Sequence, residues 1–283
     1  MSVDLGRYGT WLRRDQLTPE LATEIEELGY GAIWIGGSPP ADLALPEELL
    51  AATTRIAIAT GIVNIWQAPA REVAESYHRL EKAYPGRFLL GVGIGHPEAV
   101  QEYRSPYDTI VGYLDDLDDA GVPVAGRALA ALGPKVLRLA GERAAGAAPY
   151  LTTAQHTAEA REILGPGPLL APEHKVVLSA DPEYARTVGR PRVRDPYLRL
   201  SNYRRNLLRT GFTAEDLDTA SDRTIDALVL HGDAATVVAG LDAHLEAGAD
   251  HVCAQILTAS GTPDDEYRTA LRALAAELGP SRT

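Results

Sequence analysis

A glycine-rich cluster at the end of one apolar run places a histidine where it could exchange a proton with a ligand. The run from Phe88 to Ile94 continues into Gly95 and His96, and residues 91 and 93 are also glycine. Glycine lets the backbone approach a flat ligand closely, and an imidazole titrates near neutral pH. The pattern predicts His96 as a general acid or base at the carboxyl end of a strand.

A second break in strand geometry ends the preceding apolar run, Ile56 to Asn64. Within it, Thr60, Gly61 and Ile62 interrupt a stretch rich in β-branched residues. An amphipathic segment from Ala70 to Ala83 joins the two runs, which predicts a βαβ unit. Active sites of α/β barrels lie at the carboxyl ends of the strands, so we expect both glycine-containing ends to face one ligand.

The segment from Ala130 to Leu137, AALGPKVL, has the residue types of an anion-binding helix start. Gly133 ends a predicted strand, and Pro134 begins the first helical turn. Backbone N–H groups and the positive end of the helix dipole would then face the ligand, and Lys135 adds a positive charge. The segment predicts a phosphate site, although many helices start with Gly-Pro and bind nothing.

Strand-like and helix-like segments alternate along the whole chain and would position these residues. Strands are expected over 5–12, 32–35, 56–64, 88–94, 127–132, 147–151, 175–179 and 251–257. Helices are expected over 19–28, 41–53, 70–83, 107–120, 134–144, 153–164, 234–247 and 264–278, with a long irregular helical region over 182–220. This count predicts a single (β/α)8 barrel domain over residues 1–283. The alternative is a doubly wound open sheet, but the glycines before His96 do not match the dinucleotide-binding fingerprint.

Composition narrows the range of partners. The formal net charge of -12 argues against binding to nucleic acid or to an anionic membrane, because both attract an excess of Lys and Arg. No apolar run reaches the roughly 20 residues of a membrane span, and the first residues lack the apolar stretch of a signal peptide. We therefore expect a cytoplasmic protein that acts on a small molecule. The chain contains no HExxH or paired CxxC pattern, so no metal site is predicted.

Large aromatic side chains are candidates for the walls of the pocket. Trp11, Trp34 and Trp66 each lie near the carboxyl end of one of the first three predicted strands. They could enclose a planar ring, or they could plug the end of the barrel for structural reasons. His156 lies in the first turn after the sixth predicted strand and could face the same opening. We predict Trp11, Trp66 and His156 as residues of the substrate pocket.

Four stretches resemble the family of luciferase-like flavin and deazaflavin oxidoreductases. They are YGAIWIG at 30–36, ATGIVNIWQAPAREVA at 59–74, PGRFLLGVGIGHP at 85–97 and AALGPKVLRLAGERAAGAAPYL at 130–151. The third and fourth are similar to members that use coenzyme F420, as is LEAGADHVCAQIL at 245–257. The resemblance implies a bacterial luciferase-like TIM barrel, hydride transfer at C5 of a deazaflavin, and a homodimer.

The same resemblance implies where the cofactor binds. In the family, a non-prolyl cis peptide lies in a bulge behind the ring, and the matching pair here is Gly61-Ile62. The cofactor phosphate lies near the position of Leu132 to Lys135. The cofactor-binding residues implied in this chain are Gly37, Thr60, Gly61, Ile62, Gly93, Ile94, Gly95, Ala131, Leu132, Gly133, Pro134 and Lys135. F420 also carries a polyglutamate tail, for which Arg199 and Arg205 are candidate partners; ion pairs on a solvated helix are the alternative role for these arginines.

The chain departs from the sugar-phosphate dehydrogenases of this family. Their Asp-His pair after the second strand is replaced by residues 36–39, GGSP, and their strand-four glutamate is replaced by His96. A sugar phosphate is therefore not implied as substrate. Three functions remain: an F420-dependent oxidoreductase, an FMN-dependent monooxygenase, and a barrel that binds a ligand without catalysis. A deazaflavin has carbon in place of the flavin N5 and forms no useful oxygen adduct, so oxygen consumption separates the first two.

Overall fold

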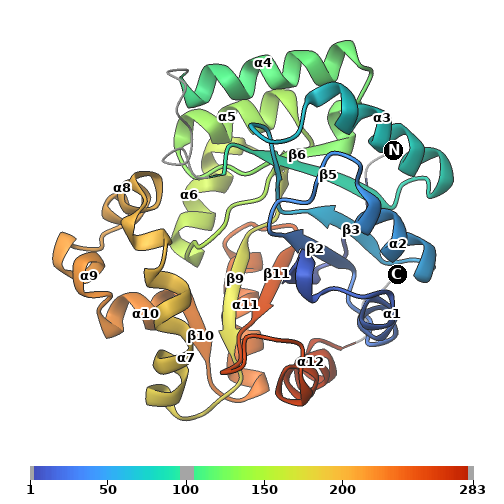
Figure 1. The fold of residues 1–283 in the computed structure, drawn as a ribbon. Helices are drawn as coiled ribbons and strands as arrows, with labels where there is room; N and C mark the ends of the chain where they lie inside the picture. Colours follow the sequence, from blue (N-terminus) through green and yellow to red (C-terminus); the bar gives the residue numbers. More distant parts are fainter. Residues whose placement is uncertain (1–2, 96–104, 280–283) are drawn as a thin grey trace.

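The computed structural model describes residues 3–95 and 105–279, which form a parallel sheet curled into a (β/α)8 barrel with helices outside it (Figure 1). The strands are β1 Tyr8–Arg13, β2 Ala32–Gly36, β3 Ala57–Thr60, β4 Val63–Asn64, β5 Phe88–Gly93, β6 Arg127–Leu129, β7 Gly146–Ala147, β8 Leu169–Leu170, β9 Glu173–Val177, β10 Val229–His231 and β11 Val252–Ile256. The helices are α1 Pro19–Glu27, α2 Ala44–Ala52, α3 Ala70–Ala83, α4 Pro106–Asp119, α5 Pro134–Arg143, α6 Ala154–Leu164, α7 Pro182–Arg194, α8 Ser201–Arg209, α9 Ala214–Thr219, α10 Asp222–Leu228, α11 Ala234–Glu246 and α12 Asp265–Leu278.

The order of the strands excludes the doubly wound alternative. Strand β1 pairs with both β2 and β11, and the sheet then runs through β3, β5, β6, β7 and β8 in sequence order. The stretch 169–177 joins the two edges, because β8 pairs with β7 and β9 pairs with β11. The eight expected strand positions are thus confirmed, with residues 169–177 as the seventh.

The boundaries differ from the sequence expectation at three places. The third strand is divided into β3 and β4 at Gly61-Ile62, which is the cis peptide that the resemblance implies. The three-residue strand β10, which pairs with β9, was not expected from the sequence. The long helical region over 182–220 is three separate helices, α7, α8 and α9, which α10 follows, and α7 ends before a cis Asp195-Pro196 bond. These helices pack around a second apolar cluster and form a lobe on one side of the barrel (Figure 1).

Capping residues explain where several helices begin. Thr18 accepts a hydrogen bond from the backbone N–H of Leu21 in front of α1, and Ser105 does the same for Asp108 in front of α4. Both helices have proline in the first turn, where a missing N–H costs nothing. Helix α5 also begins with a proline, but its N-cap, Gly133, has no side chain to satisfy the first N–H groups. The start of α5 therefore remains suited to an external acceptor.

Side chains alternate across the strands and divide the core in two. In β3, Ala57 and Ala59 point into the barrel, while Ile58 packs against the surrounding helices. The interior cluster combines such small residues with Trp11 and Trp34. This alternation is typical of a barrel whose interior is filled by side chains. Small interior residues leave room above them at the carboxyl ends of the strands.

Candidate active site

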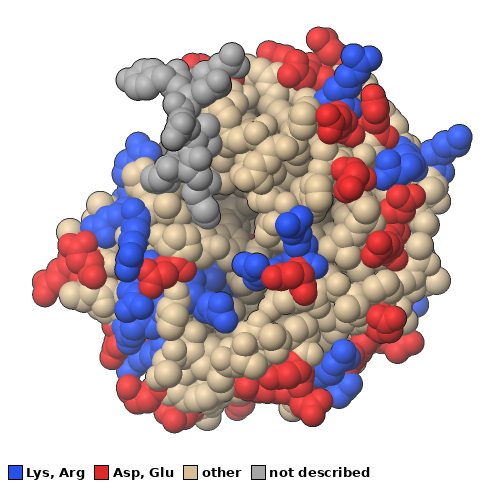
Figure 2. All heavy atoms as spheres, viewed as in Figure 1, with Lys and Arg blue, Asp and Glu red and all other residues tan. Residues whose placement is uncertain are grey.

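A cavity of about 990 Å³ opens at the carboxyl ends of the barrel strands. Its walls come from the ends of the strands, from the start of α5, and from α8 in the lobe that follows β9. The volume lies at the upper end of the range for ligand pockets and can hold a tricyclic ring together with a small substrate. Figure 2 shows the hollow near the centre of the face, with basic side chains gathered around it.

Most of the residues expected to contact the cofactor line this cavity. The walls include the cis peptide pair Gly61-Ile62, the end of β5 and the start of α5. The expected residues found there are Trp11, Gly37, Gly61, Ile62, Ile94, Gly95, Ala131, Leu132, Gly133, Pro134 and Lys135. The structure thus brings together segments that are more than 120 residues apart in the sequence.

Thr60 and Gly93 lie behind the cavity wall rather than on it. Thr60 is fully buried, and its hydroxyl both donates to the carbonyl of Gly91 and accepts from the Gly91 N–H, each at 2.8 Å. It therefore ties β3 to β5. A Cβ at Gly93 would lie 2.9 Å from the Cβ of Ala130, so this glycine permits close packing of the neighbouring segment. Neither residue is part of the cavity lining, and direct contact of either with a cofactor stays a prediction.

Two residues predicted for the substrate pocket, Trp66 and His156, are not part of the cavity lining. Trp66 packs against the apolar core outside the barrel, after β4 has ended. His156 is 1% exposed, and its Nε2 lies 2.9 Å from the carbonyl oxygen of Leu132. Because the ring reaches that oxygen from the first turn of α6, it supports the loop before α5 from behind. His96 lies outside the described residues, and its assignment as an acid or base stays a prediction.

The start of α5 has features of an anion site. Gly133 borders open space, since a Cβ built there would meet nothing within 4 Å. The ammonium group of Lys135 lies 3.5 Å above the centre of the Tyr107 ring, and both residues line the cavity. A cation held over an aromatic ring keeps its charge near the opening. Backbone donors, a helix dipole and a fixed ammonium group therefore face the same space.

The charge of the cavity is opposite to that of the whole protein. Its lining includes six basic residues, Arg13, Lys135, Lys175, Arg192, Arg205 and Arg209, and two acidic residues, Glu173 and Asp195. A positive hollow in a chain of net charge -12 concentrates anionic ligands locally while the rest of the surface repels them. The arrangement favours a ligand that carries phosphate or carboxylate groups.

The floor of the cavity contains a polar cluster that the sequence reasoning did not assign. Glu173 and Lys175 point inward from β9, and the Lys175 ammonium group donates to Glu173 at 3.1 Å. The same ammonium group lies 3.9 Å from the centre of the Tyr150 ring. The Tyr150 hydroxyl donates to the side-chain oxygen of Gln255 at 2.9 Å. One sequence feature could have indicated this cluster. Glu173 and Lys175 are two residues apart, so both charged side chains lie on the same face of a strand.

Burial alters the ionisation of this cluster. Burial raises the pKa of Tyr150 well above the ordinary value for tyrosine, and nearby Tyr197 and Glu173 add to the effect. Burial lowers the pKa of the Lys175 ammonium group, and the Glu173 carboxylate opposes that shift. Strongly shifted groups at the wall of a cavity are typical of functional sites.

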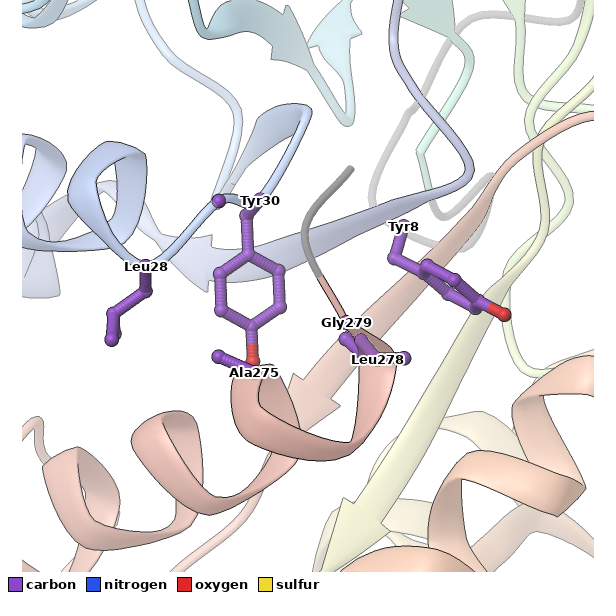
Figure 3. Close-up of a pocket in the computed structure, with 7 residues that line it drawn as sticks. Tyr8, Leu28, Tyr30, Ala275, Leu278 and Gly279 are labelled. Carbon is purple, nitrogen blue, oxygen red and sulfur yellow. The ribbon is translucent and has the colours of Figure 1, made fainter. Parts of the chain in front are cut away.

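A second hollow, near the opposite end of the barrel, is too small for a ligand. It lies between the end of α1, the start of β1 and the end of α12, and is lined by Tyr8, Leu28, Tyr30, Ala275, Leu278 and Gly279 (Figure 3). Its volume of about 10 Å³ is at most that of one water molecule. The site is therefore assigned to the large cavity.

Comparisons with known proteins agree with this fold. Residues 13–120 match the family model for luciferase-like monooxygenases. These residues include the ends of β3 and β5, which supply the cis peptide and the glycine-rich wall of the cavity. This part of the chain is similar to the luciferase-like family, and the match ends before β6.

The similar proteins include one solved with F420 and one solved with FMN. An N-acetyl-S-alkylcysteine monooxygenase of Bacillus subtilis (strain 168) is 38% identical over 116 residues, which span 36% of this chain and 35% of that protein. An F420-dependent secondary alcohol dehydrogenase, solved with an F420–acetone adduct, has a TM-score of 0.74 at 18% identity, with full coverage of both chains. The FMN-bound oxygenating component of the 3,6-diketocamphane monooxygenase of Pseudomonas putida has a TM-score of 0.70 at 14% identity and covers 99% of both chains.

Two further observations concern partners. Within residues 3–95 and 105–279, no helix has both the length and the apolar character needed to span a bilayer. In the same ranges, no group of three His, Cys, Asp or Glu side chains is placed to hold a metal ion. The expectation of a homodimer stays a prediction.

Proposed function

We propose that this luciferase-like chain is an F420-dependent oxidoreductase that moves a hydride between the deazaflavin and a small organic substrate. The observation that carries the proposal is the positive cavity, in which the bare start of α5 and Lys135 lie at one wall and Arg205 at another. F420 carries a phosphodiester and a carboxylate-rich tail, whereas FMN carries only a phosphate. Basic residues on two separated elements fit the longer anion better.

The residues present fit a tricyclic cofactor. The Gly61-Ile62 pair and Trp11 line the cavity, and a Cβ on Gly61 would lie 3.1 Å from the Trp11 Nε1. The Oδ1 of Asn202, on α8, is buried and has no hydrogen-bond partner among the described residues. An unpaired buried acceptor at a cavity wall is costly unless a ligand supplies a donor. When bound, F420 would supply the two-electron hydride chemistry at C5, and the protein would orient it and exclude water.

The second candidate is an FMN-dependent monooxygenase. It is favoured by the similarity to the N-acetyl-S-alkylcysteine monooxygenase and by the FMN-bound structure with the same fold. The deciding experiment is a fluorescence titration of the purified protein with F420 and, separately, with FMN. Measurable F420 affinity without oxygen consumption during turnover supports the first proposal. Tight FMN binding with no F420 affinity at low ionic strength would move the chain to the second.

Reversing the charge of Lys135 is expected to weaken both cofactors. In Lys135→Glu, a carboxylate would lie beside the phosphate in place of an ammonium group, and the dissociation constant should rise about tenfold or more. Equilibrium titration at low salt measures the change. Lys82→Glu makes the same change of net charge at an exposed position on α3 and should leave both affinities unchanged. Equal effects of the two substitutions would remove Lys135 from the anion site.

Reversing the charge of Arg205 is expected to discriminate between cofactors. Arg205 lines the cavity, so Arg205→Glu should weaken F420 increasingly as its glutamate tail lengthens, and should affect FMN little. Arg199, the other candidate for the tail, is 73% exposed, pairs with Asp195 and is not part of the cavity lining, so Arg199→Glu is the comparison variant. Affinities for F420 species of defined tail length test this. A tail-length dependence that is the same in Arg199→Glu and Arg205→Glu would contradict it.

A further inference from the structure

At the floor of the cavity, hydrogen bonds join two tyrosine hydroxyl groups and a glutamine side chain in a row. Their order indicates a path for a proton. The Tyr197 hydroxyl donates to the Tyr150 oxygen at 3.2 Å, and the Tyr150 hydroxyl donates to Gln255 at 2.9 Å. All three residues line the cavity. Tyr150 is thus the central member, with a donor on one side and a neutral acceptor on the other. Its proton can turn from Gln255 toward a ligand oxygen without breaking the bond from Tyr197.

Three elements hold the Tyr150 ring in place. Its ring centre lies 5.5 Å from that of Trp11 on β1 and 5.2 Å from that of Tyr197 in the segment before α8. On a third side, the Lys175 ammonium group lies 3.9 Å from the ring centre. The Glu173 carboxylate, which pairs with Lys175, also accepts the backbone N–H of Leu151 at 3.0 Å and so fixes the chain next to Tyr150.

The ion pair beneath Tyr150 is more than a packing feature. The side chains of Lys175 and Glu173 are 1% and 5% exposed. Burying two charges costs several kcal/mol per ion before pairing, and apolar residues of similar volume often stabilise a fold equally well. A charged pair at a cavity wall is therefore more easily explained by an electrostatic task. A cation 3.9 Å from a phenol ring stabilises the negative charge that develops when that phenol gives up its proton.

We propose that Tyr150 is the proton donor to the oxygen of a carbonyl substrate, that Tyr197 is a positioning residue that orients its hydroxyl, and that the Lys175 ammonium group stabilises the phenolate left behind. The reaction rests on the proposed function, which supplies a reduced deazaflavin as the hydride donor. The carbonyl carbon gains the hydride, the C=O π electrons move to the oxygen, and that oxygen takes the proton as the Tyr150 O–H bond breaks. The carbonyl is reduced to an alcohol, the deazaflavin is oxidised, and the phenolate regains a proton from water.

The ionisation of Tyr150 agrees with this role. Its raised pKa keeps the hydroxyl protonated at neutral pH, so in the resting site it is a donor and not a base. The charged and titratable groups that face it are Tyr197, Tyr203, Glu173, Lys175 and Arg13. Tyr197 donates to its oxygen, and Arg13 and Lys175 carry positive charge. Glu173 is held by Lys175 and by the N–H of Leu151.

A test that needs no cofactor follows from the expected hydrogen bond. Benzaldehyde labelled with ¹³C at the carbonyl is a suitable probe, because the walls around Tyr150 are aromatic. The infrared difference spectrum of the probe is recorded with the cofactor-free wild type and with cofactor-free Tyr150→Phe. The carbonyl band should lie at lower frequency in the wild type, where Tyr150 donates a hydrogen bond to the carbonyl oxygen. Tyr197→Phe should reduce the shift in part, because a phenol that accepts no hydrogen bond is a weaker donor. A band with the same frequency in the wild type and in Tyr150→Phe overturns the proposal.

Turnover and cofactor binding separate this inference from the proposed function. Reduction of a carbonyl substrate by reduced F420 should fall roughly 100-fold or more in kcat for Tyr150→Phe, while its F420 dissociation constant stays within a few-fold. Tyr184→Phe removes a hydroxyl that bonds to Glu266 outside the cavity, and it should change neither quantity. Unchanged kcat in Tyr150→Phe removes Tyr150 from the mechanism. A wild-type protein that binds no F420 contradicts the proposed function instead, and leaves the infrared result as the test of Tyr150.

Discussion

Replacing Glu26 by alanine is expected to lower the free energy of unfolding by about 3 kcal/mol or more, because it strips several buried donors of their acceptor. Glu26 is 7% exposed at the end of α1, and its Oε1 accepts the backbone N–H groups of Thr54, Arg55 and Ile56 at 2.7 to 2.9 Å. Burial raises the pKa of this carboxyl, but the three N–H bonds outweigh burial and hold the pKa below its usual value. Urea unfolding at neutral pH, followed by tryptophan fluorescence, measures the loss.

The neighbouring Glu27 offers a matched control for Glu26. It lies exposed on the same turn of α1 and accepts none of these bonds, so Glu27→Ala should change stability by less than about 0.5 kcal/mol. The segment 54–56 leads directly into β3, which ends at the cis peptide of the cavity wall. Glu26→Ala is therefore also expected to weaken cofactor binding. Similar unfolding midpoints for the two variants would show that the N–H groups find other acceptors.

Mild acid is expected to destabilise the fold through its buried histidines. Burial lowers the pKa of both His244 and His251 from 6.5 to about 4, and burial also lowers the pKa of His174. Because the folded-state pKa lies below the unfolded one, the unfolded chain binds more protons between these values. Stability is therefore complete above about pH 6.5 and falls as the pH drops toward 4, by an amount on the order of 3 kcal/mol for each of His244 and His251.

The histidine effect can be separated from the titration of carboxylates. His244 lies between His174 and Thr157, with ring nitrogens 2.8 Å from each partner. His244→Asn removes one proton-binding group from the unfolded chain, so the slope of unfolding free energy against pH should become shallower between pH 6.5 and 4. His78→Gln, at an exposed position on α3, should leave the slope unchanged. A wild-type slope in His244→Asn would exclude this residue as a source of acid sensitivity.

The barrel was predictable because its signals are local. Apolar runs of strand length alternate with amphipathic segments, and prolines such as Pro19 and Pro134 mark the first turns of helices. The short strand β10, helix α10 and the division of residues 182–220 into three helices escaped prediction. A three-residue strand carries too little pattern to be recognised, and the lobe is organised by its own apolar cluster rather than by the barrel.

Part of the candidate site was also predictable from local backbone chemistry. Glycine at 61, 95 and 133 and proline at 134 indicate places where the chain can approach a ligand or leave N–H groups free, and all four line the cavity. The side chains were less predictable. His156 and Trp66 have suitable types and positions along the chain, yet one supports the α5 loop from behind and the other packs against the outer core. Position after a strand does not determine which way a side chain points.

By itself, the sequence determined the barrel, the strand ends that line its large cavity and the start of α5, whose N-cap glycine borders that cavity. Each of these depends on residue patterns within about ten neighbours, through hydrophobic periodicity and backbone geometry. The tertiary structure alone decided that Tyr150, Lys175 and Gln255 meet on the cavity floor, although up to 105 residues separate them. Closure of the sheet makes β9 and β11 neighbours. This pairing brings the buried ion pair and the hydrogen-bonded side chains together, although none of these residues is distinctive in the sequence.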